Sequence, residues 1–149
     1  MKIRPYSTKD KEQVLGLLRL NIPKYFAPSE EADFIDYLDH ALEDYFVVEL
    51  NGVIVGCGGV NYIVEDSEAR ISWDMIHPDF HGKGIGKQLT KHRIECVKQL
   101  KKSSRIVVRT SQLAYKFYEK MGFTLERQEA DYWAEGFHLY YMSLPLNQT

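Results

Sequence analysis

The sequence predicts a single α/β (α+β) domain over residues 1–149, with a mixed, mostly antiparallel central sheet flanked by helices. Three observations lead to this prediction. The chain of 149 residues has the length of one domain and shows no internal repeat or low-complexity linker. Its hydrophobic content of 44%, with ten tyrosines and seven phenylalanines, is typical of a packed globular protein. Hydrophobic periodicity then gives the element order β-α-α-β-β-β-α-β-α-β-β.

The N-terminal part is expected to contain one short strand and two helices. The strand covers residues 2–6, and Ser7 followed by Asp10 is typical of a capping box at the start of the first helix. A loop with two prolines leads to the second helix, which begins at Ser29. Each helix has one apolar face, formed by Val14, Leu17, Leu18 and Leu20 in the first and by Phe34, Ile35, Leu38, Ala41 and Leu42 in the second.

Three strands follow as a predicted antiparallel meander. Asn51-Gly52 is a strong signal for a tight turn between the strands 45–50 and 53–64. The third strand, 69–76, comes after the acidic turn EDSE. Alternation along this strand places Ile71, Trp73 and Met75 on one face and Ser72, Asp74 and Ile76 on the other.

A long helix, a strand and a short helix are expected next. The long helix starts in a glycine-rich turn and runs to about Lys101, before the strand 105–110. Its apolar stripe is expected to contain Ile85, Leu89, His92, Cys96 and Leu100. The short helix 112–121 ends at Gly122, a residue type that commonly terminates helices.

The chain is predicted to close with a hairpin. Its strands, 123–129 and 137–144, are joined by an aromatic loop that contains Tyr132 and Trp133. An exposed edge strand near the C-terminus offers a surface for a homodimer.

Composition and charge argue against several classes of partner. The net charge of −2 gives no general attraction to nucleic acid or to an anionic membrane. No apolar stretch approaches the ~20 residues of a membrane span, and the first residues resemble no signal peptide. Cys57 and Cys96 have no metal-ligand spacing. We therefore expect free thiols, a cytoplasmic protein and no metal site.

The stretch DFHGKGIGKQL, residues 79–89, is the strongest functional signal. A strand, a glycine-rich turn and a helix N-terminus together form an anion site, because unpaired N–H groups and the helix dipole favour negative charge. Gln88 after Lys87 excludes a Walker loop, and the glycine spacing excludes the dinucleotide fingerprint GxGxxG. The alternative is a tight loop that needs glycine only for its dihedral angles.

Two motifs resemble signatures of the GNAT (GCN5-related N-acetyltransferase) superfamily. The segment MIHPDFHGKGIG is similar to the family's acetyl-CoA loop, Q/R-x-x-G-x-G/A, with His81 in the place of glutamine or arginine. The segment TSQLAYKFYEKMGF, 110–123, is similar to N-x-x-A-x-x-L/F-Y-x-K-x-G-F, with Ser111 in the place of asparagine. The two motifs occur in the family's order, and the predicted elements agree with its fold over essentially the whole chain.

This resemblance implies an N-acetyltransferase that transfers the acetyl group of acetyl-CoA to a primary amine by direct attack in a ternary complex. Backbone amides of the turn would hold the pyrophosphate, and the end of the strand 69–76 would pair with the pantetheine arm. Tyr118 would act as the general acid that protonates the CoA thiolate. The residues expected to bind the cofactor are Met75, Ile76, His81, Gly82, Lys83, Gly84, Ile85, Gly86, Lys87 and Ser111.

The residues themselves support part of these roles. On the helix 112–121, a buried arc of Leu113, Ala114, Phe117 and Met121 would leave Tyr118 half-buried at its edge. Asp74 is an acid in an apolar strand, where burial would make its carboxylate a better base for the acceptor amine. The alternatives are a structural Asp74 that is paired with a lysine or bonded to backbone, Glu68 acting through water, and attack by a neutral amine without a dedicated base.

The acceptor is less well defined. By the resemblance, it is selected by the first two helices and by the last hairpin, whose segments are rich in aromatic and acidic residues. Such a wall suits a cation with an apolar part, as in a small amine, an amino-acid derivative or a peptide N-terminus. A different class of function, an acyl-CoA-binding regulatory module without turnover, is the alternative that the substitutions at His81 and Ser111 allow.

Overall fold

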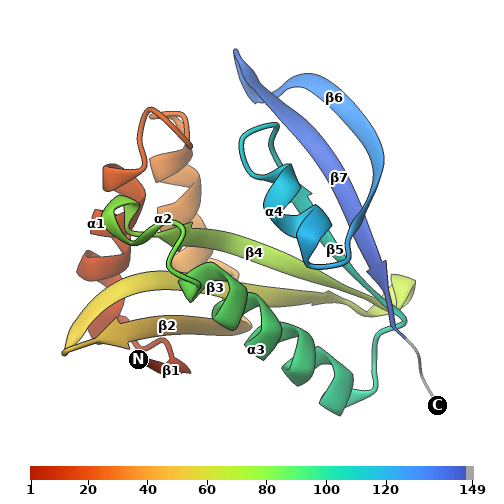
Figure 1. The fold of residues 1–149 in the computed structure, drawn as a ribbon, viewed down its shortest axis with the longest axis horizontal. Helices are drawn as coiled ribbons and strands as arrows, with labels where there is room; N and C mark the ends of the chain where they lie inside the picture. The colour runs from red at the N-terminus through yellow and green to blue at the C-terminus, as the bar shows by residue number, and fades with distance from the viewer. Residues whose placement is uncertain (147–149) are drawn as a thin grey trace.

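Seven strands form one sheet with helices on both faces in the computed structural model, which describes residues 1–146 (Figure 1). The strands are β1 (Lys2–Pro5), β2 (Asp44–Leu50), β3 (Val53–Ile63), β4 (Glu68–Ile76), β5 (Arg105–Thr110), β6 (Thr124–Ala134) and β7 (Phe137–Pro145). The α-helices are α1 (Lys11–Leu20), α2 (Glu30–His40), α3 (Ile85–Leu100) and α4 (Tyr115–Lys120). Short 3-10 helices are η1 (Thr8–Asp10), η2 (Val64–Asp66) and η3 (Pro78–Phe80). This order confirms the predicted fold class and the antiparallel meander of β2, β3 and β4.

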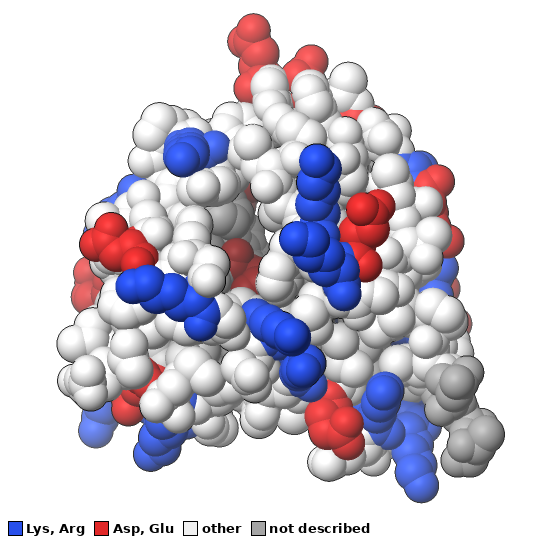
Figure 2. Space-filling model, in the orientation of Figure 1, with Lys and Arg blue, Asp and Glu red and all other residues white. Residues whose placement is uncertain are grey.

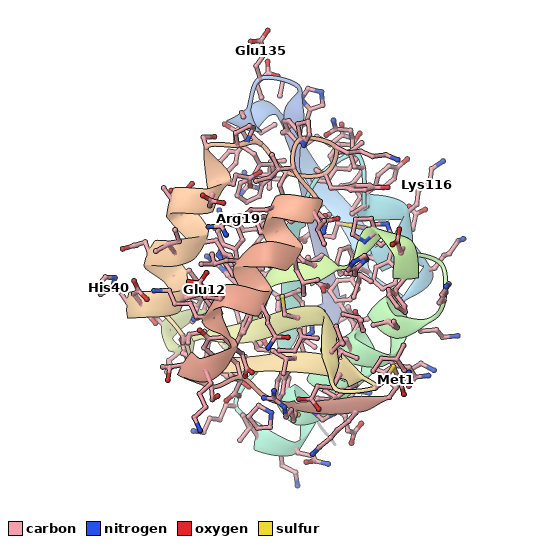
Figure 3. The ribbon with its side chains drawn as sticks, turned by 90° about the vertical axis from the view of Figure 1, so that its left-hand side faces the viewer. Met1, Glu12, Arg19, His40, Lys116 and Glu135 are labelled. Atoms are coloured by element: carbon pink, nitrogen blue, oxygen red, sulfur yellow. The ribbon has the colours of Figure 1, made fainter. Side chains whose placement is uncertain are left out.

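Helices α1 and α2 lie side by side on one face of the sheet (Figure 3). The predicted capping box is present, since the backbone N–H of Ser7 donates to Asp10 Oδ2 at 2.9 Å. Salt bridges of Arg19 with Glu31 and of Lys11 with Asp39 connect the two helices at their surface. Their apolar faces pack on the sheet in a cluster that includes Val14, Leu17, Leu18, Phe34, Leu38, Tyr45, Val47, Cys57 and Met75.

Helices α3 and α4 cover the other face. The buried side of α3 consists of Ile85, Leu89, Thr90, Arg93 and Val97. Of the predicted stripe, Ile85 and Leu89 are buried, but His92, Cys96 and Leu100 are not among the buried residues of α3. Leu100 is 44% exposed. Helix α3 directs Arg93 toward the sheet, where its guanidinium donates a hydrogen bond to the Asp74 carboxylate. His92 packs edge-on against Phe46.

One local prediction near the C-terminus is wrong. Strand β6 extends to Ala134, so Tyr132 and Trp133 belong to the strand and not to a loop. The hairpin turns at Glu135 and Gly136, and Gly136 has the positive φ of 81° that such a turn needs. Glu135 marks the projecting tip of this hairpin in Figure 3.

A β-bulge in β4 changes which side chains share a face. Met75 pairs with Cys57 and Ser72 with Gly59, so two β4 residues, Trp73 and Asp74, oppose one residue of β3. Trp73 has a φ of 44°, outside the strand region. The simple alternation predicted for this strand therefore breaks. Ile71 packs on the side of α3 and α4, whereas Trp73 and Met75 pack on the side of α1 and α2.

The sheet opens between β4 and β5, its one parallel pair. These strands are paired only from Glu68 with Arg105 to Ile71 with Val108, and beyond that point they diverge (Figure 1). We call this opening the fork. Among the helices of residues 1–146, none is long and apolar enough to cross a membrane.

Candidate active site

A cavity of about 840 Å³ occupies the fork. In Figure 2 it appears as a hollow with Lys and Arg side chains around its mouth. Its walls come from both faces of the sheet: α3 and α4 with their preceding loops on one side, and α1, α2 and the end of the β6–β7 hairpin on the other. The cavity therefore passes through the sheet at the place where two strands part.

The glycine-rich turn forms one end of this cavity. Gly82 and Gly84 have φ values of 75° and 85°, a conformation that favours glycine, and Gly84 is the N-cap of α3. The first backbone bond of the helix runs from Gln88 N to Gly84 O, so the amides before it have no partner within the helix. A Cβ on Gly84 would meet nothing within 4 Å, which shows that the space above the turn is open.

Most of the expected cofactor residues surround the cavity. Those that line it are Met75, Ile76, His81, Gly82, Gly84, Gly86, Lys87 and Ser111. Two others point elsewhere: Lys83 Nζ lies 5.1 Å from the centre of the Phe80 ring, and Ile85 packs in the core.

A hydrogen bond of His81 connects the glycine-rich turn to the end of β4. Its Nε2 lies 2.9 Å from the carbonyl oxygen of Ile76, and because a carbonyl only accepts, Nε2 carries the proton. Buried Asn21, at the end of α1, donates to the same carbonyl through Nδ2 at 3.1 Å. Sequence reasoning missed Asn21, which joins α1 to the rim of the cavity.

The centre of the site is a cluster of three polar side chains from three elements. Asp74 Oδ2 accepts hydrogen bonds of 2.6 Å from Tyr118 Oη and of 2.6 Å from Arg93 Nη2. Arg93 is fully buried and also donates to the carbonyl oxygen of Gly59. A Cβ on Gly58 would lie 2.6 Å from Arg93 Nη1, so any larger residue there would have to displace this guanidinium.

Burial decides the protonation of Tyr118. The side chain is 5% exposed, not half-buried as expected, because α4 begins only at Tyr115 and directs Tyr118 inward, whereas Leu113 lies in the preceding turn and is 45% exposed. This burial, together with the negative charge of Asp74, raises the pKa of Tyr118 well above its ordinary value. Tyr118 is therefore a neutral hydrogen-bond donor at any physiological pH.

Arg93 is the main functional residue that sequence reasoning missed. Its partner is the Asp74 carboxylate, so Asp74 is paired with an arginine and not with a lysine, as one alternative had it. A signal did exist, since Leu89, Arg93 and Val97 follow one another at intervals of four residues. An arginine inside such an apolar series indicates a buried cation.

Glu68, the other proposed base, is engaged at the opposite end of β4. Its carboxylate accepts from Arg70 Nε at 2.5 Å and from Arg105 Nη2 at 2.7 Å. Burial opposes its charge, but the hydrogen bonds from the two arginines hold the pKa of Glu68 below its usual range. Glu68 does not line the cavity within the described part of the chain.

The wall on the side of α1 and α2 carries aromatic and charged groups. Tyr25, Phe26, Tyr37, Trp73, Trp133 and Phe137 supply the aromatic surface. Glu30 and Asp33 line the cavity from α2, and Arg70 and Arg109 line it from β4 and β5. Residues 1–146 hold no group of three or more His, Cys, Asp or Glu side chains that could bind a metal ion.

Residues 41–125 match the family model described as an acetyltransferase (GNAT) domain. The chain belongs to the GNAT family. This confirms the family that the two sequence motifs predict.

Curated relatives agree with this family. A Methanocaldococcus jannaschii protein described as an uncharacterized N-acetyltransferase is 34% identical over 90 residues, which cover 54% of this chain and 39% of that protein. An amino-acid acetyltransferase of Actinobacillus pleuropneumoniae is 25% identical over 121 residues, which cover 74% of this chain. The chain thus spans well under half the length of these relatives, 39% and 25%.

Solved GNAT structures share the whole fold. The Escherichia coli ribosomal-protein-S18-alanine N-acetyltransferase superposes with a TM-score of 0.82 at 17% identity, covering 99% of this chain and 95% of that one. An aminoglycoside 6'-N-acetyltransferase in complex with coenzyme A gives a TM-score of 0.81 at 14% identity, covering 100% and 99%. These likenesses confirm the GNAT-like fold predicted for the chain.

Proposed function

We propose that this protein is an N-acetyltransferase that uses acetyl-CoA to acetylate a primary amine. One observation carries the proposal: the bare glycine turn and the Tyr118–Asp74 hydrogen bond open into the same cavity at the fork. An anion site and a proton donor within one cavity are what transfer from a CoA thioester requires.

The residues around the turn suit the cofactor. Unpaired amides from Gly82 to Lys87 would bind the pyrophosphate, with the Lys87 ammonium beside them. The free edge of β4 beyond Ile71 would pair with the pantetheine arm, near Met75 and Ser111. His81 and Asn21 already donate to the carbonyl oxygen of Ile76. Ile76 would therefore contact the cofactor through its other atoms and not through this carbonyl.

The proposed chemistry assigns each proton to a residue. The amine nitrogen attacks the thioester carbonyl, the C–N bond forms and the C–S bond breaks. Asp74 takes the proton that the amine loses, and Tyr118 gives its proton to the departing thiolate. Asp74 then returns a proton to the phenolate along their 2.6 Å hydrogen bond, which restores the starting state.

Arg93 would position Asp74 for its proton exchange with Tyr118. Its ion pair holds the Asp74 carboxylate in a fixed position beside Tyr118. Asp74 Oδ2 receives both hydrogen bonds, whereas Oδ1 accepts none from side chains of residues 1–146. Oδ2 is therefore the atom through which Asp74 would return a proton to the Tyr118 phenolate.

Release of CoA thiol tests the proposal directly. The purified chain is incubated with acetyl-CoA and a panel of small amines, amino acids and short peptides, and thiol is followed over time. Acceptor-dependent release is expected. Saturable binding of acetyl-CoA without release from any acceptor would instead favour the regulatory module.

The two unpaired thiols suit a reducing compartment, and we propose a cytoplasmic enzyme on that basis.

A further inference from the structure

Arg109 lies at the point where β4 and β5 separate. The last paired residues are Ile71 and Val108, so Arg109 is the first β5 residue beyond the pairing. Val108 packs in the core beside α4, and alternation therefore directs Arg109 to the opposite face, the side of α1 and α2. Its side chain lines the cavity there.

The guanidinium of Arg109 is held in place but not neutralised. Nη2 donates to Tyr132 Oη at 3.1 Å, and Cζ lies 5.7 and 5.5 Å from the ring centres of Tyr132 and Trp133. Trp133 is itself fixed, because its Nε1 donates to the Thr110 carbonyl at 3.1 Å. Within residues 1–146, no carboxylate forms a salt bridge with Arg109. Most of its five N–H donors are thus available to a ligand.

The charged side chains of strands β4 and β5 themselves leave a positive excess. Arg70 also lines the cavity, but its Nε is committed to Glu68, and Arg105 shares that same carboxylate. Asp74 is balanced by Arg93. The other acids of the cavity, Glu30 and Asp33, belong to α2 and form no salt bridge within residues 1–146, although Glu30 accepts a hydrogen bond from the Ala27 N–H.

We propose that Arg109 binds a carboxylate of the acceptor, so the acceptor is an amine that carries a carboxylate close to its nitrogen. The inference rests on the proposed acetyltransferase function and names its substrate class. The planar guanidinium matches a carboxylate in a bidentate pair, and the aromatic rings beside it hold that plane in a fixed orientation. The acids of α2 repel a carboxylate and Arg109 of β5 attracts it, so these two elements orient the acceptor. Free amino acids and peptides that begin with Asp or Glu share this chemistry.

Matched acceptors test the inference on the unmodified protein. Leucine is compared with 3-methylbutylamine, which lacks only the carboxylate, and a peptide beginning with Glu is compared with the same peptide beginning with Gln. The kcat/KM for thiol release is expected to favour the carboxylate member of one pair by roughly tenfold or more. The pair that shows the preference identifies the source, amino acid or peptide.

Two variants that each lose one positive charge test whether Arg109 is the residue that recognises the carboxylate. R109Q is expected to lower the preference for the carboxylate by roughly tenfold, mainly through a higher KM for the carboxylate acceptor. R127Q is the control, since Arg127 of β6 has its Cζ 4.6 Å from the centre of the Tyr141 ring of β7 and does not line the cavity. R127Q should keep the preference.

Failure of the inference is distinct from failure of the proposed function. Thiol release that is equal or faster with the carboxylate-free amines, or a preference that survives in R109Q, would overturn the role of Arg109 and leave acetyl transfer standing. Absence of release with every acceptor would refute the acetyltransferase, and the inference with it.

Discussion

At the scale of single residues, the site depends on one carboxylate oxygen. Asp74 Oδ2 accepts from a phenol and a guanidinium at 2.6 Å each, and the pair is nearly closed to water because Arg93 and Tyr118 are buried. A hydrogen bond in such surroundings is stronger than in water, and its loss is more costly. The three side chains are therefore expected to act as a unit.

Replacement of Tyr118 by phenylalanine removes only the proton donor. We expect kcat to fall by about 100-fold or more, the usual contribution of a general acid, with little change in acetyl-CoA affinity. Steady-state kinetics across pH measure this. Y115F is the matched control, because Tyr115 is on the same helix but stacks on Tyr140 outside the cavity. An unchanged kcat in Y118F would rule out the assigned role.

Replacement of Arg93 by methionine leaves the Asp74 charge without its partner. We expect the free energy of unfolding to fall by about 3 kcal/mol or more, as for other broken buried ion pairs. The double variant R93M/D74N removes both charges and should be more stable than R93M alone. Urea denaturation measures both values. If the effects of the two substitutions were simply additive, the pairing would not be energetically important.

At the scale of elements, β3 makes room for this cluster. Its segment GCGG places Gly58 directly beneath the guanidinium, and a Cβ there would lie 3.1 Å from Asp74 Oδ1. The facing strand β4 contributes a bulge that turns Asp74 toward α3 and α4. A glycine in one strand and an extra residue in its neighbour thus position the same carboxylate.

Gly58→Ala is expected to destabilise the protein by about 1–3 kcal/mol, because the new methyl group must displace the guanidinium. It should also lower kcat, which a change in stability alone would not do at low temperature. Gly16→Ala is the control: a Cβ there meets nothing within 4 Å, and alanine is the better helix former. Equal stability of the two variants in urea would contradict the packing described here.

The secondary-structure elements also show which features can be predicted from the sequence alone. Periodicity and turn signals predict the strands, the meander and the glycine turn, because these depend on local patterns. They do not predict the bulge at Trp73, which has a φ of 44° and packs against Phe34 of the distant helix α2. Tyr118 and Asp74 were both proposed from the sequence. Their hydrogen bond and Arg93 were not, because the fold joins residues 44 positions apart.

At the scale of the whole molecule, buried acids and phenols set the pH range of stability. Burial raises the pKa of Cys57 to about 12 and those of Tyr45 and Tyr118 well above their ordinary values. The folded state therefore holds these protons when the unfolded chain has lost them, so their contribution is complete below about pH 9 and disappears as pH rises. In contrast, the hydrogen bond from Arg4 lowers the pKa of Asp10, and its contribution disappears in acid.

The free energy of unfolding should accordingly form a plateau near neutral pH and fall at both ends. Above pH ~9, each group that titrates only in the unfolded chain is expected to reduce it by up to about 1.4 kcal/mol per pH unit. Urea denaturation at a series of pH values measures the slope. C57A should show a shallower slope between pH ~9 and ~10, where the unfolded thiol ionises first. A constant stability up to pH ~11 would contradict the burial of these groups.

The central claim is that the glycine turn at the fork binds acetyl-CoA, and calorimetric titration with acetyl-CoA tests it most directly. The unmodified chain should bind at a single site. Gly84→Ala should weaken binding by roughly tenfold or more, because a side chain disfavours the left-handed turn that presents the amides. Gly52→Ala has the same kind of strain at a φ of 79° in the turn between β2 and β3, away from the cavity, and should bind normally. Absence of binding to the unmodified chain, or equal affinity in the two variants, would contradict the account.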